Sequence, residues 1–223
     1  MRIYTYVKNN MNITKSEVIK LHKEGRILVN GKIENLSRNI RADEVVTIDG
    51  VELKNEEFYY YVYNKPKGVI CTNNKNVKGN IIDSLGIAKR LYSVGRLDKD
   101  THGLLFLTND NEFTHFVLEN ENIEKEYIVE TLEELDEKKI SMMQESIIIN
   151  GKNTTPAIVR KIDSHFLSVI IHEGKYHQVR KLVIHAGMHL VDLKRIRIGK
   201  FVLDEEKIKE GEYLRINNLK EMV

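Results

Sequence analysis

The order of apolar and polar positions predicts that the first 53 residues form a small unit of their own. Two short helices are expected there, one over Tyr4 to Asn10 and one that begins after Thr14. Thr14 and Glu17 have the spacing of a capping box, in which each side chain binds the backbone N–H of the other residue. Gly25 marks the end of the second helix.

A compact β-structure is predicted after these helices. Asn30-Gly31 lies between apolar residues, which is a strong short-range signal for a β-hairpin, so residues 26–33 are expected to form one. A further strand is expected over residues 45–48 and ends at Asp49-Gly50. The first unit is therefore predicted to contain two helices followed by a hairpin.

The pattern changes to short strands at Phe58, after a polar joint at residues 54–57. The aromatic residues 59–63 favour a strand, which Lys65-Pro66-Lys67-Gly68 interrupts before residues 69–71 continue it. Further strands are predicted at residues 104–108, 127–130, 147–149, 157–159, 167–171 and 190–198. Helices are predicted over residues 111–118, 133–145 and 178–186. These elements indicate an α+β domain over residues 58–220, built on a mixed, mostly antiparallel sheet.

The composition limits the class of protein. With 223 residues and 41% hydrophobic side chains, the chain suffices for one moderate domain and a small additional unit. Apolar runs of only a few residues exclude a membrane span, and the N-terminus lacks the pattern of a signal peptide, so a cytoplasmic protein is expected. The single cysteine, Cys71, excludes an internal disulfide and a cysteine-based zinc site, and its apolar neighbours favour packing over a nucleophilic role.

Charge is distributed unevenly, although the net charge is only +2. Residues 119–145 contain ten acidic and three basic side chains, whereas residues 171–200 contain seven basic and two acidic ones. A basic segment of this kind attracts a polyanion, which makes nucleic acid a plausible partner. An ordinary solvated surface is the alternative.

Asp98 is the leading candidate for chemistry. It lies in a polar turn between Gly95 and Gly103, directly before an apolar strand. Such a turn holds a carboxylate partly out of water while leaving it reachable, which suits a nucleophile or a general base. On these residues alone, an ordinary turn aspartate is the competing interpretation.

Two other chemistries fit the sequence poorly. A metal site is suggested by His172, His177, His185 and His189, but Gly187 interrupts the helical spacing of His185 and His189, and no carboxylate pair completes the set. No metal is expected. Asp98 and Asp100 lie two residues apart in one turn, which places them badly for flanking a glycosidic bond from opposite sides.

Residues 1–53 resemble the S4 RNA-binding domain, also called the αL domain. The segment Gly25-Arg26-Ile27-Leu28-Val29-Asn30-Gly31 carries most of this resemblance. Such domains often have arginines leading into the second helix, where this chain has Thr14-Lys15-Ser16. Because a lysine cannot bind a phosphate through two parallel hydrogen bonds, weaker phosphate contact is expected at this position.

Further segments extend the resemblance to essentially the whole chain. With the S4-like start, they resemble the RsuA/RluB/RluE/RluF group of ribosomal RNA pseudouridine synthases. The segments are Asn64-Lys65-Pro66-Lys67-Gly68, Gly95-Arg96-Leu97-Asp98 and Glu173-Gly174-Lys175-Tyr176-His177-Gln178-Val179-Arg180. The order and spacing of the segments make the match specific.

The resemblance implies roles for three residues. Asp98 corresponds to the catalytic aspartate of the group, Arg180 to its guanidinium partner, and Tyr127 to the active-site tyrosine that stacks on the extruded base. Without the resemblance, Arg180 is an ordinary helix arginine and Tyr127 a half-buried strand tyrosine. The implied reaction is an isomerisation in which nothing is oxidised and no group is imported, so no cofactor is expected.

Basic and polar residues around the cleft and on the first unit are the candidate RNA contacts. They are Arg96, Lys65, Lys67, His177, Gln178, Lys194, Arg195, Arg197, Lys15 and Arg26. Strand alternation predicts that Arg195 and Arg197 share one face as a phosphate-facing stripe, with Ile196 and Ile198 on the other. His177 and Gln178 are expected either to orient their loop or to contact RNA.

The sequence thus predicts a cofactor-free pseudouridine synthase that acts on a specific uridine of ribosomal RNA. The small subunit is slightly favoured, DNA is not an expected partner, and a monomer suffices. The alternative is a catalytically inactive S4-type RNA-binding or ribosome-assembly protein, against which the presence of Asp98, Tyr127 and Arg180 argues. The residues leave open whether Asp98 attacks carbon or removes a proton.

Overall fold

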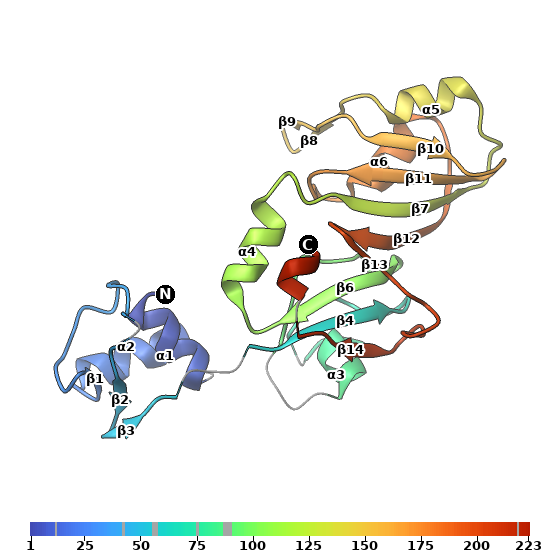
Figure 1. Cartoon of the computed structure of the whole chain (residues 1–223). Coiled ribbons are helices and arrows are strands. Elements are labelled where there is room, and N and C mark those ends of the chain that lie inside the picture. The colour runs from blue at the N-terminus through green and yellow to red at the C-terminus, as the bar shows by residue number, and fades with distance from the viewer. Residues whose placement is uncertain (12, 42, 55–57, 75, 87–90, 218) are drawn as a thin grey trace. The chain divides into compact units, whose positions relative to one another are not determined.

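The computed structural model of the chain describes residues 1–11, 13–41, 43–54, 58–74, 76–86, 91–217 and 219–223. The chain divides into two compact units, Met1–Phe58 and Tyr59–Val223 (Figure 1). Residues 55–57 of the predicted polar joint lie outside the described residues. Within the described ranges, no helix has the length and apolar character needed to cross a membrane.

The first unit contains two helices and a three-stranded sheet. Its elements are α1 (Ile3–Met11), α2 (Lys15–Lys23), β1 (Ile27–Val29), β2 (Val46–Ile48) and β3 (Val51–Glu52). The Thr14 side chain accepts a hydrogen bond from the Glu17 N–H, and the Glu17 carboxylate binds the Thr14 N–H, which confirms the predicted capping box. Apolar side chains of both helices and of β1 and β2 form one buried core.

The predicted hairpin at residues 26–33 is wrong in its strand pairing. Asn30 and Gly31 do form a turn with positive φ, but the two sides of this turn are joined only by an isolated β-bridge between Val29 and Lys32. The partner of β1 is β2, which carries the buried side chains of Val46 and Ile48, whereas the Ile33 side chain is 60% exposed. Burial of an apolar face therefore selects the partner strand, and the turn alone does not.

The second unit is built on one large mixed sheet. Its strands are β4 (Tyr60–Lys65), β5 (Tyr92–Ser93), β6 (His102–Thr108), β7 (Lys125–Thr131), β10 (Ile158–Lys161), β11 (Phe166–Ile171), β12 (Leu190–Ile198), β13 (Phe201–Val202) and β14 (Tyr213–Arg215). The main path runs β10-β11-β7-β12-β6-β4-β14. Only the pairing of β12 with β6 is parallel among the registers described, so the predicted mixed, mostly antiparallel sheet is confirmed.

Helices cover both faces of this sheet (Figure 1). The remaining elements are α3 (Ile81–Leu85), α4 (Asn111–Glu119), α5 (Glu137–Met143), α6 (Gln178–His185), the 3₁₀ helix Leu219–Met222 and a two-stranded ribbon of β8 (Ile148–Ile149) and β9 (Lys152–Asn153). Leu104 and Phe106 of β6 pack in the core that includes α4, and Leu105 and Leu107 pack in the core that includes α6. Burial on both faces explains the uninterrupted apolar run of β6.

In the second unit, one predicted strand segment and the start of one predicted helix differ from the structure. Residues 69–71 do not continue the strand, because Ile70 makes only an isolated bridge with Asn80. The helix predicted over residues 133–145 begins later, after Asp136, whose side chain accepts a hydrogen bond from the Lys139 N–H as an N-cap. The short elements α3, β5, β13 and β14 have too few residues to produce a clear periodicity.

Candidate active site

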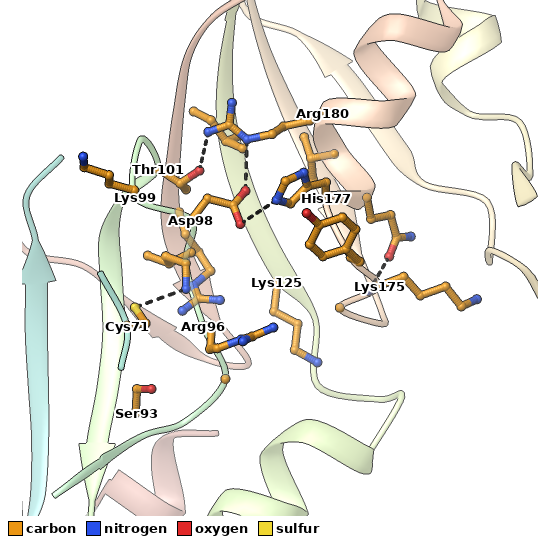
Figure 2. A pocket seen from close by; sticks show the side chains of 18 of the residues that line it. Cys71, Ser93, Arg96, Asp98, Lys99, Thr101, Lys125, Lys175, His177 and Arg180 are labelled. Carbon is orange, nitrogen blue, oxygen red and sulfur yellow. Dashed lines mark hydrogen bonds and ion pairs between the residues drawn. The ribbon is translucent and has the colours of Figure 1, made fainter. Parts of the chain in front are cut away.

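A cavity of about 870 Å³ opens in the second unit, on the side of the sheet covered by α6. Its floor comes from β7 and β12, and its walls come from residues 70–73, 92–93, 95–99, 101 and 174–180. Figure 2 shows Asp98, His177 and Arg180 pointing toward one another within this cavity. The structure thus brings together segments that lie about eighty residues apart in the sequence, as the Asp98–Arg180 separation of 82 residues illustrates.

Asp98 begins a turn that is closed by a hydrogen bond from the Thr101 N–H to the Asp98 carbonyl oxygen at 3.1 Å. Arg180 Nε donates to Asp98 Oδ2 at 3.0 Å, and His177 Nε2 lies 3.2 Å from Asp98 Oδ1. Arg180 Nη2 also donates to Thr101 Oγ1 at 2.8 Å, so one guanidinium holds both ends of the turn. The Asp98 side chain remains 37% exposed. This carboxylate is oriented by a cation and still open to the cavity.

The floor of the cavity carries Lys125, Tyr127 and Arg195. Lys125 and Tyr127 are two residues apart on β7 and share its buried face, and Tyr127 is the register partner of Arg195 on β12. Arg195 Nη1 donates to Tyr127 Oη at 3.5 Å, and Arg195 Nε donates to the Leu104 carbonyl oxygen at 2.8 Å. The tyrosine ring therefore shares this floor with two cationic side chains.

Gly103 brings β6 close enough to hold Arg195. The register of the parallel pair places Gly103 opposite Arg195, with a Gly103 φ of +97°. A Cβ atom at Gly103 would lie 2.3 Å from the Arg195 carbonyl oxygen, which no real Cβ tolerates. A glycine is therefore required at this crossing, both for its backbone conformation and for space.

The predicted stripe of Arg195 and Arg197 is wrong. The register of β12 shifts between these residues, so they do not alternate as an ideal strand would. Arg195 is buried in the cavity floor, whereas Arg197 Nε and Nη2 bind Glu126 at 2.7 Å and Glu124 at 2.9 Å. The arginines thus occupy different surroundings, and Arg197 is neutralised by two carboxylates.

The loop before α6 is held by Gln178. Gln178 Oε1 accepts from the Lys175 N–H at 3.1 Å, and its Nε2 donates to Glu173 Oε1 at 3.1 Å. These two hydrogen bonds give buried Gln178 the loop-orienting role, and because Gln178 also lines the cavity, its contact with RNA stays a prediction. His177 adopts a left-handed backbone with φ 55°, an uncommon conformation that clusters at functional sites, and its ring stacks on that of Tyr176 at 3.8 Å.

Lys65 does not lie on the cleft surface as predicted. It is fully buried, and its Nζ donates to the carbonyl oxygens of Val69 at 2.8 Å and Pro66 at 2.9 Å. This burial lowers the pKa of the Lys65 ammonium. Lys65 therefore supports the loop that follows β4, and it is removed from the candidate surface contacts.

The other candidate RNA contacts have varied surroundings. Arg96 lines the cavity. Lys67 pairs with Asp192 at 2.6 Å, and Lys194 pairs with Glu205 at 2.5 Å. In the first unit, Lys15 is exposed, and Arg26 binds Asp49 through Nε at 2.7 Å and Glu24 through Nη1 at 3.2 Å. Their contact with RNA stays a prediction.

Sequence reasoning missed Lys125. Its position two residues before Tyr127 on a strand was the available signal, because alternation puts both side chains on one face. Burial, helped by the nearby Arg195 charge, lowers the pKa of Lys125 to about 8. Cys71 also lines the cavity, where its Sγ accepts from the Leu97 N–H at 3.4 Å and burial raises the pKa of its thiol. A raised pKa favours the packing role expected for Cys71.

His185 and His189, two of the histidines that suggested a metal, contact separate carboxylates. His185 contacts Glu145 at 3.0 Å, and His189 contacts Glu133 at 2.5 Å. Among the described residues, no group of three potential metal ligands lies together.

Comparison with known proteins gives consistent matches. A family model described as RNA pseudouridylate synthase matches residues 59–185. The ribosomal small subunit pseudouridine synthase A of Haemophilus influenzae is 33% identical, over 96% of this chain and 94% of that protein. The dual-specificity RNA pseudouridine synthase RluF of Escherichia coli K12 is 29% identical, over 89% of this chain and 70% of that protein. A crystal structure described as a pseudouridylate synthase is 30% identical with a TM-score of 0.69, covering 99% of this chain and 97% of that one.

The family match includes Asp98, Tyr127 and Arg180 and most of the elements around the cavity. It spans more than half of the chain, and the Haemophilus influenzae relative matches nearly all of it. The chain therefore belongs to the RNA pseudouridylate synthase family, and the enzyme class expected from its sequence is confirmed.

Proposed function

We propose that this enzyme converts a specific uridine of ribosomal RNA into pseudouridine, with Asp98 as the catalytic carboxylate. The observation that carries the proposal is the Asp98 carboxylate, held by Arg180 at 3.0 Å inside a cavity of about 870 Å³. Ribosomal RNA as the substrate is supported by the name of the Haemophilus influenzae relative, which acts on the small ribosomal subunit.

Asp98 acts on the ribose of the target nucleotide. The uracil must leave C1′, turn over and rejoin the sugar through C5. The Asp98 carboxylate either attacks C1′ or removes the proton from C2′, and both routes need it ionised and oriented. Arg180 supplies this orientation, because its guanidinium binds both Asp98 and Thr101.

Tyr127 receives the extruded base. Taking a base out of an RNA stack costs a few kcal/mol, which stacking on an aromatic ring and hydrogen bonds to the base edge must offset. Tyr127 lies on the cavity floor next to Arg195, where a ring and a cation are available together. This position supports stacking as the role of Tyr127.

Residues 1–53 serve as an RNA-binding unit of the S4 type in this proposal. The two helices and the small sheet of the first unit support it, as does exposed Lys15. The small ribosomal subunit is the favoured source of the target. The Escherichia coli relative is named as a dual-specificity enzyme, which makes mapping of both ribosomal RNAs necessary.

The test is chemical mapping of pseudouridines in both ribosomal RNAs from cells that lack the protein. We expect one site to be lost, and to be restored by the wild type but not by Asp98→Asn. Asp100→Asn is the matched control, because this exposed carboxylate lies in the same turn and should restore the site. Restoration by Asp98→Asn would remove Asp98 from its role. An unchanged map would favour an inactive RNA-binding protein.

A further inference from the structure

Two cations in the cavity floor are buried without a carboxylate partner. Lys125 is 6% exposed and Arg195 is 5% exposed. Lys125 Nζ donates only to the His172 carbonyl oxygen, at 3.2 Å, among the described atoms. Neither side chain makes an ion pair within the part of the chain that the structure describes. Arg197, two residues further along β12, binds two carboxylates, so the lack of neutralisation is specific to the floor.

Arg195 also has an unused donor. Its Nε and Nη1 bind Leu104 and Tyr127, but its Nη2 is shielded from solvent and has no hydrogen-bond partner among the described atoms. A buried donor that stays unsatisfied costs about 1–3 kcal/mol, and more when it belongs to a charged group. Buried charges are ordinarily paired. Together, these two cations without a carboxylate partner favour an anion in the cavity that they line.

These donors lie beside the ring proposed to hold the base. Lys125 and Tyr127 share one face of β7, and Arg195 is the register partner of Tyr127 on β12. Lys125 and Arg195 both line the cavity that contains Asp98. A uracil stacked on Tyr127 therefore has its carbonyl oxygens O2 and O4 near these cations.

We propose that Lys125 and Arg195 bind the carbonyl oxygens of the target uracil and stabilise the negative charge that develops on the base when it leaves the ribose. The inference rests on the proposed function and names two further catalytic residues for it. Donors directed at developing charge in a site shielded from water are among the strongest contributors to catalysis.

The charge arises from the bond that breaks. When the C1′–N1 bond breaks, its electron pair goes to N1, and the uracil becomes an anion whose charge is shared by N1, O2 and O4. C1′, which has lost this electron pair, either forms a bond to an Asp98 oxygen or forms a double bond to C2′ as the C2′ proton moves to Asp98. After the base turns, C5 forms the new bond to C1′ while the bond from C1′ to the Asp98 oxygen breaks or C2′ regains its proton from Asp98. The C5 proton is then lost and N1 gains a proton. No oxidant or reductant is needed, and the cationic floor acts on the anion between these two bond changes.

A phosphate of the RNA backbone is the competing source of anionic oxygen. Lys125 and Arg195 share the buried floor with Tyr127, whereas Lys67 is exposed and pairs with Asp192, an ion pair that an RNA phosphate can exchange. A phosphate contact contributes to binding and makes it depend on salt, whereas stabilisation of the departing base contributes to the rate of the chemical step. The two sources therefore predict different measurements.

The test compares Lys125→Met, Lys125→Arg and Arg195→Lys with the wild type on unmodified transcripts of both ribosomal RNAs. Single-turnover rates at saturating RNA are measured together with the Kd for RNA. We expect Lys125→Met to lower the rate roughly 100-fold, the loss typical of one such donor, with less than a threefold change in Kd. Arg195→Lys, which keeps the charge but loses the Nη2 donor, should lose at least about tenfold. Lys138→Met, which removes an exposed charge on α5 within the acidic segment of residues 119–145, is the control and should leave both values unchanged.

The pH dependence gives a second readout. The titratable groups that line the cavity together with Lys125 are Cys71, Tyr92, Arg96, Asp98, Lys99, Tyr127, Lys175, Tyr176, His177, Arg180 and Arg195. Of these, the Arg195 charge acts on the Lys125 ammonium. The wild-type rate is expected to fall above about pH 8 as Lys125 loses its proton, and Lys125→Arg should remove this alkaline decline because arginine stays charged. A decline that persists unchanged in Lys125→Arg would contradict the assignment.

Two outcomes overturn the inference while the proposed function stands. The first is an active wild type with Lys125→Met retaining more than about a third of the rate. The second is a Kd that rises more than tenfold at an unchanged saturating rate, with a weaker salt dependence, which assigns the cations to phosphate. Failure of the wild type to modify either transcript, or turnover by Asp98→Asn, would instead reject the proposed function.

Discussion

Replacement of Lys125 by methionine should make this enzyme more stable while it removes activity. The lysine is 6% exposed in the cavity floor and has no carboxylate partner among the described residues. Methionine has a similar length and flexibility, so it fills the same space without a charge. The folded state then no longer has to hold a desolvated ammonium group.

The magnitude follows from the pKa of Lys125, which burial lowers from 10.5 to about 8. Each tenfold change in acidity corresponds to about 1.4 kcal/mol, so the charged lysine costs the folded state about 3 kcal/mol at neutral pH. The hydrogen bond from Nζ to the His172 carbonyl oxygen is lost in the variant, which reduces the gain by about 1 kcal/mol. We therefore expect Lys125→Met to raise the free energy of unfolding by about 2 kcal/mol.

The gain must depend on pH in a defined direction. Between the folded pKa of about 8 and the unfolded value of 10.5, the unfolded chain binds more protons at Lys125 than the folded protein does. The wild type therefore gains stability from this group as the pH rises through that window. The gain should be full at pH 7, and by about pH 11 the variant should no longer be more stable than the wild type.

Unfolding in urea is monitored by the hydrogen exchange of peptides from β7 and β12. Because both strands belong to the second unit, this measurement reports on that unit alone. At a typical urea dependence of about 2 kcal/mol per molar, the midpoint of Lys125→Met should lie about 1 M higher at pH 7. Lys200→Met, which removes an exposed charge, should not move it. A variant that is no more stable than the wild type at pH 7, or a difference that does not change between pH 7 and 11, would refute the reasoning.

Three further expectations follow from the geometry. Gly103→Ala should lower the free energy of unfolding by more than about 2 kcal/mol, because its Cβ would lie 2.3 Å from the Arg195 carbonyl oxygen. Unfolding in urea measures this loss, and a smaller loss would contradict the expectation. Arg180→Lys should lower kcat about 10–100-fold with little change in KM, because an ammonium group cannot replace the planar guanidinium that binds both Asp98 and Thr101. Steady-state kinetics measure both constants, and an unchanged kcat would contradict the expectation. Removal of residues 1–53 should weaken RNA binding and flatten its salt dependence, and an unchanged slope in filter binding would assign RNA contact elsewhere.

The sequence by itself determined the features that depend on neighbours along the chain. The capping box of Thr14 and Glu17 needs only a spacing of three residues, and it is present. The strand β6 needed only a run of apolar residues, and α6 needed only helical periodicity ended by Gly187. The pairing of Asp98 with Arg180 could be expected only through the resemblance to a family, because local patterns carry no information about residues 82 positions apart.

The tertiary structure alone decided which polar side chains are buried and what they face. Strand alternation put Arg195 and Arg197 on one face, but the register shift between them sends Arg195 into the cavity floor and Arg197 to Glu124 and Glu126. Lys65 looked like a surface cation from its neighbours, yet the chain folds over it completely.

The position of Lys125, two residues before Tyr127, places both side chains on one face of β7, but it does not show that Lys125 is buried. The physical reason is that burial and charge pairing are set by contacts between distant segments. Whether a cation at a given position is solvated, neutralised or left to a substrate depends on what the rest of the fold packs around it.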